Sequence, residues 1–413
     1  MAPVLMPAWL TTLLLEQAVG NRHGLVLRPQ RAPLSRADIE GIVHIGVPRS
    51  VDSPWESAAG GVARQETSAR AAAIAEAIER SCSAQVRLSL RTRASLPRQA
   101  RIDAEEFALF TPEQRCHPEF PHGRIYDDEC PYAEVFTLPG NAPVWVPQPF
   151  VTLQDPHRTG VPTSSGLAAG VTPQDALNRG VQELIERDAL MVTWLHGLPG
   201  RAIVPPEAHT AEVDRLGGQL WLFDLTPAYS PHPVAAVMGG IPKRGRWRYS
   251  LGVACREDWA SAAEKAYLEW NQGVMFAGIY GDYVDTSGLT DAAALRSFDE
   301  HAMFYTRNPR LWLDLPLLRQ DGRRHPPPAD SSGTGLGEAL ARAGIRVYYR
   351  EITTIDAVQA GLHVVKALSP DLAMIYSHER WPFLHKVDAM LASRYPDRLG
   401  ESAFPNRAPH PLG

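Results

Sequence analysis

Apolar residues recur along this chain with two periods, one typical of helices and one typical of strands. A spacing of three to four residues places apolar side chains on one helix face. It predicts helices at residues 4–18, 66–86, 173–196, 257–278 and 288–305. Shorter runs rich in β-branched and aromatic residues predict strands at 41–47, 133–138, 144–149, 219–226, 248–254, 345–352 and 362–368. Because the two kinds of element do not alternate strictly, we expect an α+β fold rather than a doubly wound sheet.

The helix predicted over 66–86 carries charged residues close together on one face. Ile74 and Ile78 belong to an apolar stripe, whereas Glu76, Glu79 and Arg80 lie on the opposite side. One interpretation is a solvated face on which Glu76 and Arg80 form a weak i,i+4 ion pair. The other interpretation is a functional site built on paired carboxylates.

The order Glu-x-x-Glu-Arg returns in the helix predicted over 173–196, as Glu183, Glu186 and Arg187. This repetition favours a functional site over a solvated surface. Asp188 follows and lies near the apolar side of the same helix. We expect this carboxylate to be buried with a partner, because an unpaired buried charge is costly.

A third predicted helix, 257–278, places Lys265, Glu269 and Gln272 on one face beside small alanines. Alanine allows a ligand or another backbone to approach the helix closely. Four glutamates gathered in one place repel each other unless cations lie between them. Mg²⁺ prefers oxygen ligands and usually binds together with the phosphates of a nucleotide. The three helices therefore predict a site for Mg²⁺ and a nucleotide.

These helices and a late strand lie in four stretches, "GVARQETSARAAAIAEAIER", "SSGLAAGVTPQDALNRGVQELIERDA", "AYLEWNQ" and "GLHVVKALSPDL". Together they resemble the YcaO-domain family, and the ending "APHPLG" is similar to the Pro-rich tail of its peptide-cyclising members. The resemblance runs from about Gly60 to Gly413. It implies a single YcaO-like domain over 1–413, with an N-terminal helix and strands in 1–59. The polar, Pro-rich stretch 319–335 is predicted to be a flexible loop.

The resemblance implies mixed or antiparallel sheets and long helices that carry an acidic Mg–ATP site without a P-loop. The chain indeed has no G-x-x-x-x-G-K-[ST] motif. By position in the family's motifs, the metal ligands would be Glu76, Glu79, Glu183 and Glu186. The nucleotide contacts would be Glu76, Arg80, Arg187, Glu269 and Gln272. The Pro-rich tail would contribute Pro409, Pro411 and Gly413 to catalysis.

The chain departs from the family's pattern at four positions. Val62 stands where the family often has Lys, Ala72 where it has Ser, Ser165 where it has Asn, and Gly413 where it has the last Pro. The loss of a phosphate-facing cation and a hydroxyl would weaken nucleotide binding. Arg64 and Ser68 lie near enough in the sequence to be candidates for replacing them.

Composition excludes several classes of protein. The 413 residues are 44% hydrophobic and 21% charged with a net charge of −5, which fits a soluble globular chain. The chain has no Lys/Arg cluster with interleaved aromatics of the kind that indicates nucleic-acid binding. The most basic stretch, 87–102, is either solvated or suited to an acidic partner.

The apolar N-terminus lacks the basic region of a signal peptide and is too short to span a membrane. The four cysteines show no metal-binding spacing and are typical of reduced thiols, which favours the cytoplasm.

The resemblance predicts an ATP-dependent cyclodehydratase that forms azolines from Cys, Ser or Thr in a ribosomally made precursor peptide. Thioamide or amidine formation would use the same amide activation with an external nucleophile and stays open. A third alternative, from another class, is a non-catalytic scaffold, which the departures at Val62, Ala72 and Gly413 motivate. Expected partners are the precursor peptide, a separate winged-helix or ThiF-like leader-binding protein, a flavin dehydrogenase, and a second copy of the chain or a hetero-complex.

Overall fold

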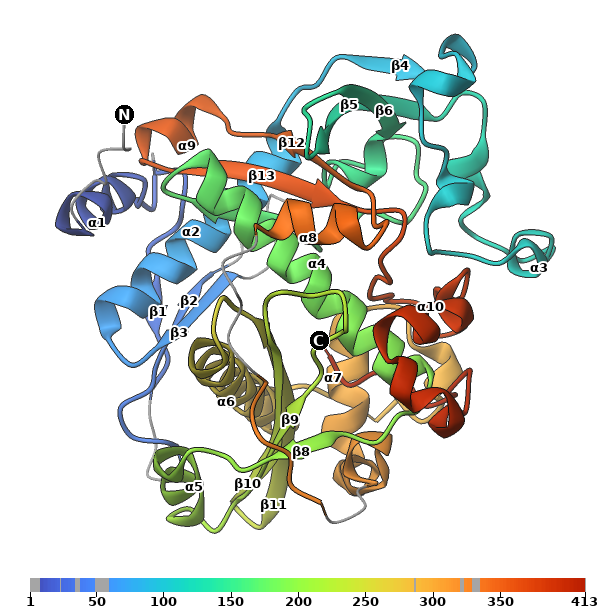
Figure 1. Ribbon diagram of the computed structural model, residues 1–413. Coiled ribbons are helices and arrows are strands. Elements are labelled where there is room, and N and C mark those ends of the chain that lie inside the picture. Colours follow the sequence, from blue (N-terminus) through green and yellow to red (C-terminus); the bar gives the residue numbers. More distant parts are fainter. Residues whose placement is uncertain are drawn as a thin grey trace.

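The computed structural model of this protein describes residues 8–22, 24–33, 38–48, 59–285, 287–319, 323–328 and 335–412. Its strands form three sheets, and all pairings between the named strands are antiparallel. Helices pack on and between these sheets (Figure 1). The arrangement confirms the α+β class with antiparallel sheets that the sequence predicts.

The three sheets differ in size and are built from separate parts of the chain. The first has the order β1 (Gln30–Arg31), β2 (Val43–Val47), β3 (Ala59–Ala63). The second has the order β11 (Arg246–Cys255), β10 (Val234–Lys243), β9 (Gln219–Asp224), β8 (Arg201–Ile203). The third has the order β4 (Leu90–Thr92), β5 (Pro131–Leu138), β12 (Val347–Glu351), β13 (His363–Leu368), β7 (Leu167–Gly170), with β6 (Pro143–Pro147) also paired to β5.

Three long helices connect the sheets: α2 (Glu66–Gln85), α4 (Pro173–Leu195) and α6 (Trp259–Tyr283). Helix α2 packs on β3 and contacts β7, α4 packs on β13 and contacts β11, and α6 packs on β11 and contacts β3. Each long helix therefore joins two of the three sheets. The shorter helices are α1 (Ala8–Gln17), α3 (Pro112–Arg115), α5 (Glu207–Asp214), α7 (Phe298–Arg307), α8 (Leu336–Arg342), α9 (Ile355–Gln359) and α10 (Val387–Arg394).

Two glycines let the helices lie directly against their strands. A Cβ atom on Gly61 of β3 would stand 1.9 Å from the carbonyl oxygen of Ala69 in α2. A Cβ atom on Gly252 of β11 would stand 2.1 Å from the carbonyl oxygen of Ala266 in α6. Both distances are far below van der Waals contact, so only glycine permits this packing. The close approach, with small residues on the helix side, fixes the polar faces of α2 and α6 relative to the sheets.

Several predicted boundaries are wrong for local reasons. The helix predicted over 288–305 is instead a short turn at Ala292–Ala294 followed by α7, because the Ser297 side chain caps a new helix by accepting from the Glu300 amide. The end of the strand predicted over 144–149 becomes a 3₁₀ turn, Gln148–Phe150. Strand β10 is missed, because its alanines and glycines have little strand propensity although the strand is almost wholly buried.

Two predictions fall partly on residues that the structure does not describe. The helix predicted over 4–18 is seen as α1, and residues 1–7 lie outside the described part. Of the loop predicted over 319–335, Arg319, 323–328 and Gly335 are described, and the His325 amide donates to the carbonyl of Ala202 at 2.8 Å. None of the described helices is long and apolar enough to cross a membrane.

Asp188 joins α4 to the C-terminal part of the chain, which confirms that this carboxylate is buried with a partner. It is fully buried and pairs with Arg394 of α10, with 3.1 Å between the Arg394 Nε and the carboxylate. It also accepts from the Tyr229 hydroxyl at 2.8 Å and from the Ala373 amide at 2.7 Å. A single carboxylate thus satisfies donors from three separate segments.

We expect Asp188→Ala to lower the free energy of unfolding by about 3–5 kcal/mol, because it leaves the buried Arg394 charge without its partner. Urea denaturation would measure the change. The matched control is Glu66→Ala, which breaks the exposed pair of Arg31 and Glu66 and should cost less than about 1 kcal/mol. Equal effects of the two substitutions would contradict this description of Asp188.

Candidate active site

The acidic face of α2 points into the molecule and is tied to two different sheets. Glu76 accepts from the Gly60 amide of β3 at 2.9 Å and pairs with Arg80 at 2.9 Å. Glu79 accepts from the Ala169 amide of β7 at 3.0 Å. The i,i+4 ion pair of Glu76 and Arg80 is therefore present, but it belongs to a partly buried cluster rather than to a fully solvated helix face.

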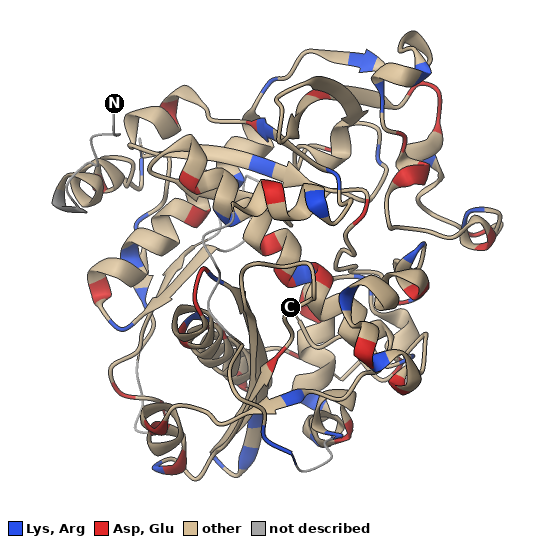
Figure 2. Cartoon of the chain, in the orientation of Figure 1, with Lys and Arg blue, Asp and Glu red and all other residues tan. Residues whose placement is uncertain are grey.

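One carboxylate of the acidic pair of α4 is held in the same way by the remaining sheet. Glu186 is 6% exposed and accepts from the Cys255 amide of β11 at 3.2 Å. Arg187 lies 3.5 Å from Glu183 and 3.8 Å from Glu186. Figure 2 shows acidic and basic positions next to one another on α2 and α4. Each of the three sheets thus offers one backbone N–H to one carboxylate of the cluster.

Helix α6 closes the third side of this cluster. Glu269 pairs with Lys265 at 3.1 Å, and its charge acts on both Glu183 and Glu186. Gln272 packs so tightly on Gly60 that a Cβ atom there would stand 2.7 Å from the Gln272 amide nitrogen. The structure therefore brings together every residue that the sequence predicts for the metal and nucleotide contacts.

Burial and mutual repulsion raise the pKa values of three of these carboxyls. Burial raises the pKa of Glu79 well above its usual range, and the charges of Glu183 and Glu76 add to this effect. Burial, with the charge of Glu269 next, raises the pKa of Glu186 to about 8. Burial also raises the pKa of Glu183. Carboxyls in such a state become good ligands only when cations replace their protons.

Lys366 of β13 is a buried cation beside the cluster that the sequence reasoning missed. Its Nζ donates to the carbonyls of Thr163 and Ser165 at 2.6 and 2.7 Å. Burial lowers the pKa of Lys366 to about 8, and the charges of Glu183 and Glu79 oppose this shift. The available signal was a single lysine inside the strand "LHVVKAL", whose other residues are apolar except His363.

The donor set fits Mg²⁺ and a polyphosphate. The Nε atoms of Arg80 and Arg187 are buried without a hydrogen-bond partner among the described residues, so two guanidinium groups have donors to spare. In the described chain, no three His, Cys, Asp or Glu side chains already surround one point as metal ligands. This geometry suits Mg²⁺, which takes one or two protein carboxylates and completes its shell with phosphates and water.

The Pro-rich tail is anchored by α7, and the Ala408 carbonyl before it accepts from Trp194 Nε1 of α4 at 2.9 Å. Pro409, His410 and Pro411 are buried. The Tyr305 hydroxyl donates to the Pro409 carbonyl at 2.6 Å, and His301 Nδ1 lies 2.9 Å from the His410 carbonyl. Burial lowers the pKa of His410 far below its usual range, and the charges of His301 and Arg187 add to the shift.

Proline side chains carry no proton to transfer, so Pro409 and Pro411 would serve by positioning the tail. Their part in catalysis stays a prediction, and Gly413 lies outside the described residues.

Neither candidate replacement for the missing Lys and Ser faces the cluster. Arg64 is bound by Glu212 at 2.7 Å and Glu264 at 2.9 Å, on α5 and α6. Ser68 is exposed on the first turn of α2, and Val62 is 6% exposed in an apolar core. Arg64 therefore does not supply a phosphate-facing cation in this structure, because two carboxylates already hold it elsewhere.

This fold and this carboxylate–guanidinium site define a Mg²⁺- and nucleotide-binding protein without a P-loop. Residues 60–373 match the family described as YcaO cyclodehydratase, ATP- and Mg²⁺-binding. Because the match covers most of the chain, the protein belongs to the YcaO family.

Other similar proteins agree with this assignment at the level of the fold. A solved heterocyclase in complex with substrate and cofactor superposes with a TM-score of 0.76 at 20% identity, covering 98% of this chain and 57% of that one. The microcin synthetase McbBCD complex of E. coli with pro-MccB17 bound gives a TM-score of 0.61 at 19% identity, covering 83% of this chain and 88% of that one.

A curated relative, the uncharacterised protein in the tfuA 3′ region of Rhizobium leguminosarum bv. trifolii, is 31% identical over 200 residues. That match spans 44% of this chain and 45% of the relative. The chain thus spans about half the length of both the heterocyclase and this relative.

The raised pKa values make the stability of the ligand-free protein depend on pH. Glu186 holds its proton up to about pH 8 in the folded chain but loses it near 4.5 when unfolded. The folded state therefore binds more protons between these values, so its free energy of unfolding falls as pH rises through this window. We expect Glu186→Gln to make the fall shallower.

Thermal unfolding at a series of pH values across this window, without nucleotide or Mg²⁺, measures the slope. Glu66→Gln, on the exposed first turn of α2, should leave the slope as it is in the parent protein. An identical slope for Glu186→Gln and the parent protein would show that the Glu186 carboxyl is not protonated there.

Proposed function

We propose that this protein is an ATP-dependent cyclodehydratase that activates backbone amides of a ribosomally made precursor peptide. The observation that carries the proposal is the cluster of Glu76, Glu79, Glu183 and Glu186, in which Glu186 is buried and the other three are partly buried, with unpartnered guanidinium donors beside it. Membership of an ATP- and Mg²⁺-binding family supports it. The fold shared with a heterocyclase and with a precursor-bound synthetase complex supports it further.

In the proposed reaction a Cys, Ser or Thr side chain of the peptide attacks the carbonyl carbon of the preceding amide. Bound Mg–ATP would supply the phosphoryl group that turns the poor amide oxygen into a leaving group. Carboxylates of α2 and α4 would hold the metal, and Arg80 and Arg187 would donate to phosphate oxygens. Fixed donors of this kind neutralise charge that develops during phosphoryl transfer. The peptide loses one water for each ring.

The two alternatives from the sequence make different predictions for the same assay. Thioamide or amidine formation needs the same cluster and would appear only when sulfide or an amine is supplied. A non-catalytic scaffold would not bind Mg–ATP, and calorimetry would show this directly. Against the scaffold, all four glutamates and both arginines of the cluster are present and in place, although gathering several carboxylates at one partly buried place is costly.

We also propose that the enzyme works with a separate leader-binding protein of winged-helix or ThiF-like type, as a homodimer or within a hetero-complex. A flavin dehydrogenase would act afterwards, by oxidising the azoline rings. The multi-subunit synthetase with a bound precursor supports this organisation. Full-rate processing of a precursor by the isolated chain, unchanged when any such protein is added, would count against it.

We expect the purified protein, given ATP, Mg²⁺, precursor and partner, to lower the peptide mass by about 18 Da for each ring. Glu79→Gln should reduce ATP consumption at least about tenfold, equivalent to about 1.4 kcal/mol of barrier. It removes one charge without changing size, so the melting temperature should stay the same or rise as carboxylate repulsion is relieved.

Glu66→Gln is the matched control, because Glu66 is an exposed glutamate on the same helix. It should turn over ATP normally. Full ATP consumption by Glu79→Gln would remove the acidic cluster from the mechanism and with it the main support for the proposed function.

A further inference from the structure

On one side of β5 in the six-stranded sheet, the hydrogen-bonded pairing with neighbouring strands is interrupted. Strand β4 pairs with β5 up to Ala133, and β12 pairs with it from Phe136 onward. Glu134 and Val135, between these two, are paired only with β6 among the described strands. The chain segments of β4 and β12 therefore both diverge from β5 at these two residues.

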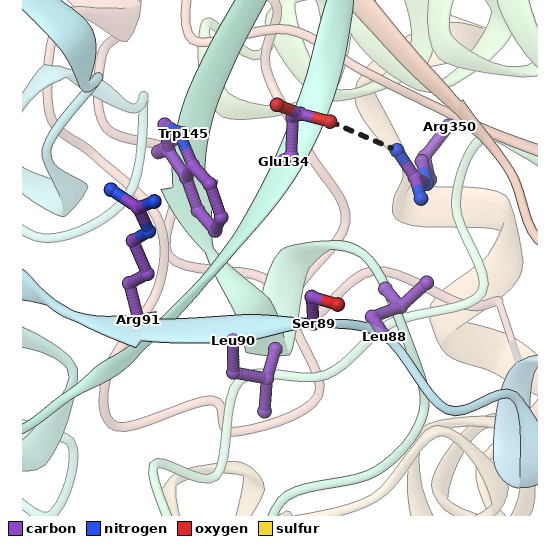
Figure 3. A pocket seen from close by; sticks show the side chains of 7 residues that line it. All are labelled: Leu88, Ser89, Leu90, Arg91, Glu134, Trp145 and Arg350. Carbon is purple, nitrogen blue, oxygen red and sulfur yellow. Dashed lines mark ion pairs between the residues drawn. The ribbon is translucent and has the colours of Figure 1, made fainter.

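A cavity of about 290 Å³ lies at this interruption (Figure 3). The apolar side chains of Leu88 and Leu90 lie at one border, and Trp145 lies at the other. Water occupies about 30 Å³ per molecule, so the cavity has room for one or two amino-acid side chains. It falls at the lower limit of cavities that hold whole small molecules.

Two arginines, both held by aromatic rings, give the cavity its charge. Arg91 lies 5.1 Å from the ring centre of Trp145, and Arg350 lies 5.6 Å from that of Phe136. Glu134 lies between them, 3.6 Å from Arg350. The Nε atom of Arg350 is buried without a hydrogen-bond partner in the described chain. A single carboxylate thus faces two guanidinium groups, which leaves positive charge and free N–H donors.

One strand pair links the cavity to the candidate active site. Arg350 of β12 is the direct cross-strand partner of Lys366 in β13. The Cβ atoms of such partners lie about 5 Å apart. Lys366 in turn lies beside Glu79 and Glu183. A peptide held at the cavity would therefore be one strand away from the acidic cluster.

We propose that this cavity binds an acidic side chain of an extended segment of the precursor peptide, an inference that rests on the proposed function. The peptide carboxylate takes the free donors of Arg91 and Arg350 in charge-assisted hydrogen bonds. Neighbouring apolar residues of the peptide contact Leu88, Leu90 and Trp145. The rest of the peptide segment lies extended across the mouth of the cavity.

The test is fluorescence anisotropy with a labelled octapeptide, Ser-Gly-Leu-Glu-Val-Glu-Gly-Ser, and its twin with Gln in place of both Glu residues. The assay contains no ATP, so its outcome is independent of whether the protein turns over ATP. We expect the acidic peptide to bind about tenfold more tightly than its twin and to weaken as salt is added. Arg91→Gln and Arg350→Gln should each remove most of this preference.

Two further variants separate the proposal from a simple loss of folding. Glu134→Gln should bind the acidic peptide more tightly than the parent protein, because it removes the carboxylate that competes for Arg350. Arg87→Gln, exposed on the same segment outside the cavity, should bind as the parent protein does.

Three results would each overturn the proposal. They are equal affinity for the two peptides, weaker binding by Glu134→Gln, and an equal loss in Arg87→Gln. Displacement of the peptide by an eight-nucleotide oligouridylate that depends on the same two arginines would replace the peptide with nucleic acid as occupant.

Discussion

The burial of carboxylates from two helices, α2 and α4, at one place is the constraint on which the rest of this structure depends. Taking several negative charges out of water costs free energy, and bringing them together adds repulsion. The raised pKa values of Glu79, Glu183 and Glu186 record this cost. The arrangement is stable without metal only because protons, guanidinium groups and backbone donors compensate the charge.

All three sheets contribute backbone donors that compensate the negative charge of the cluster. Gly60 of β3, Ala169 of β7 and Cys255 of β11 each donate a backbone N–H to one carboxylate of the cluster. Tight helix–strand packing at Gly61 and Gly252 holds these donors in register with the helices. A site assembled from α2, α4 and α6 therefore exists only when the whole domain is folded, and it has little freedom to collapse when empty.

The acidic faces of the helices and the burial of Asp188 could be predicted from the sequence, because both depend on local patterns. The period of α2 and α4 placed Glu76, Glu79, Glu183 and Glu186 on helix faces, and the number of glutamates indicated cations. Asp188 was correctly expected to be buried with a partner because of its place on the apolar side of α4.

The contacts that sequence reasoning missed are set by tertiary packing. Lys366 is separated in sequence from the carboxylates it accompanies, and its strand reads as ordinary core. Arg64 lies in the same sequence stretch as Glu76 and Glu79, but its partners Glu212 and Glu264 come from α5 and α6. Strand β10 has weak strand propensity and is stabilised by burial between β9 and β11.

The most direct test of the central claim is a crystal structure with Mn²⁺ in place of Mg²⁺ and a non-hydrolysable ATP analogue. We expect anomalous Mn²⁺ peaks within coordination distance of carboxylate oxygens from both α2 and α4, with the analogue's phosphates between them and Arg80 and Arg187. Metal and phosphates bound elsewhere, with Glu79, Glu183 and Glu186 contacting only protein groups, would contradict it.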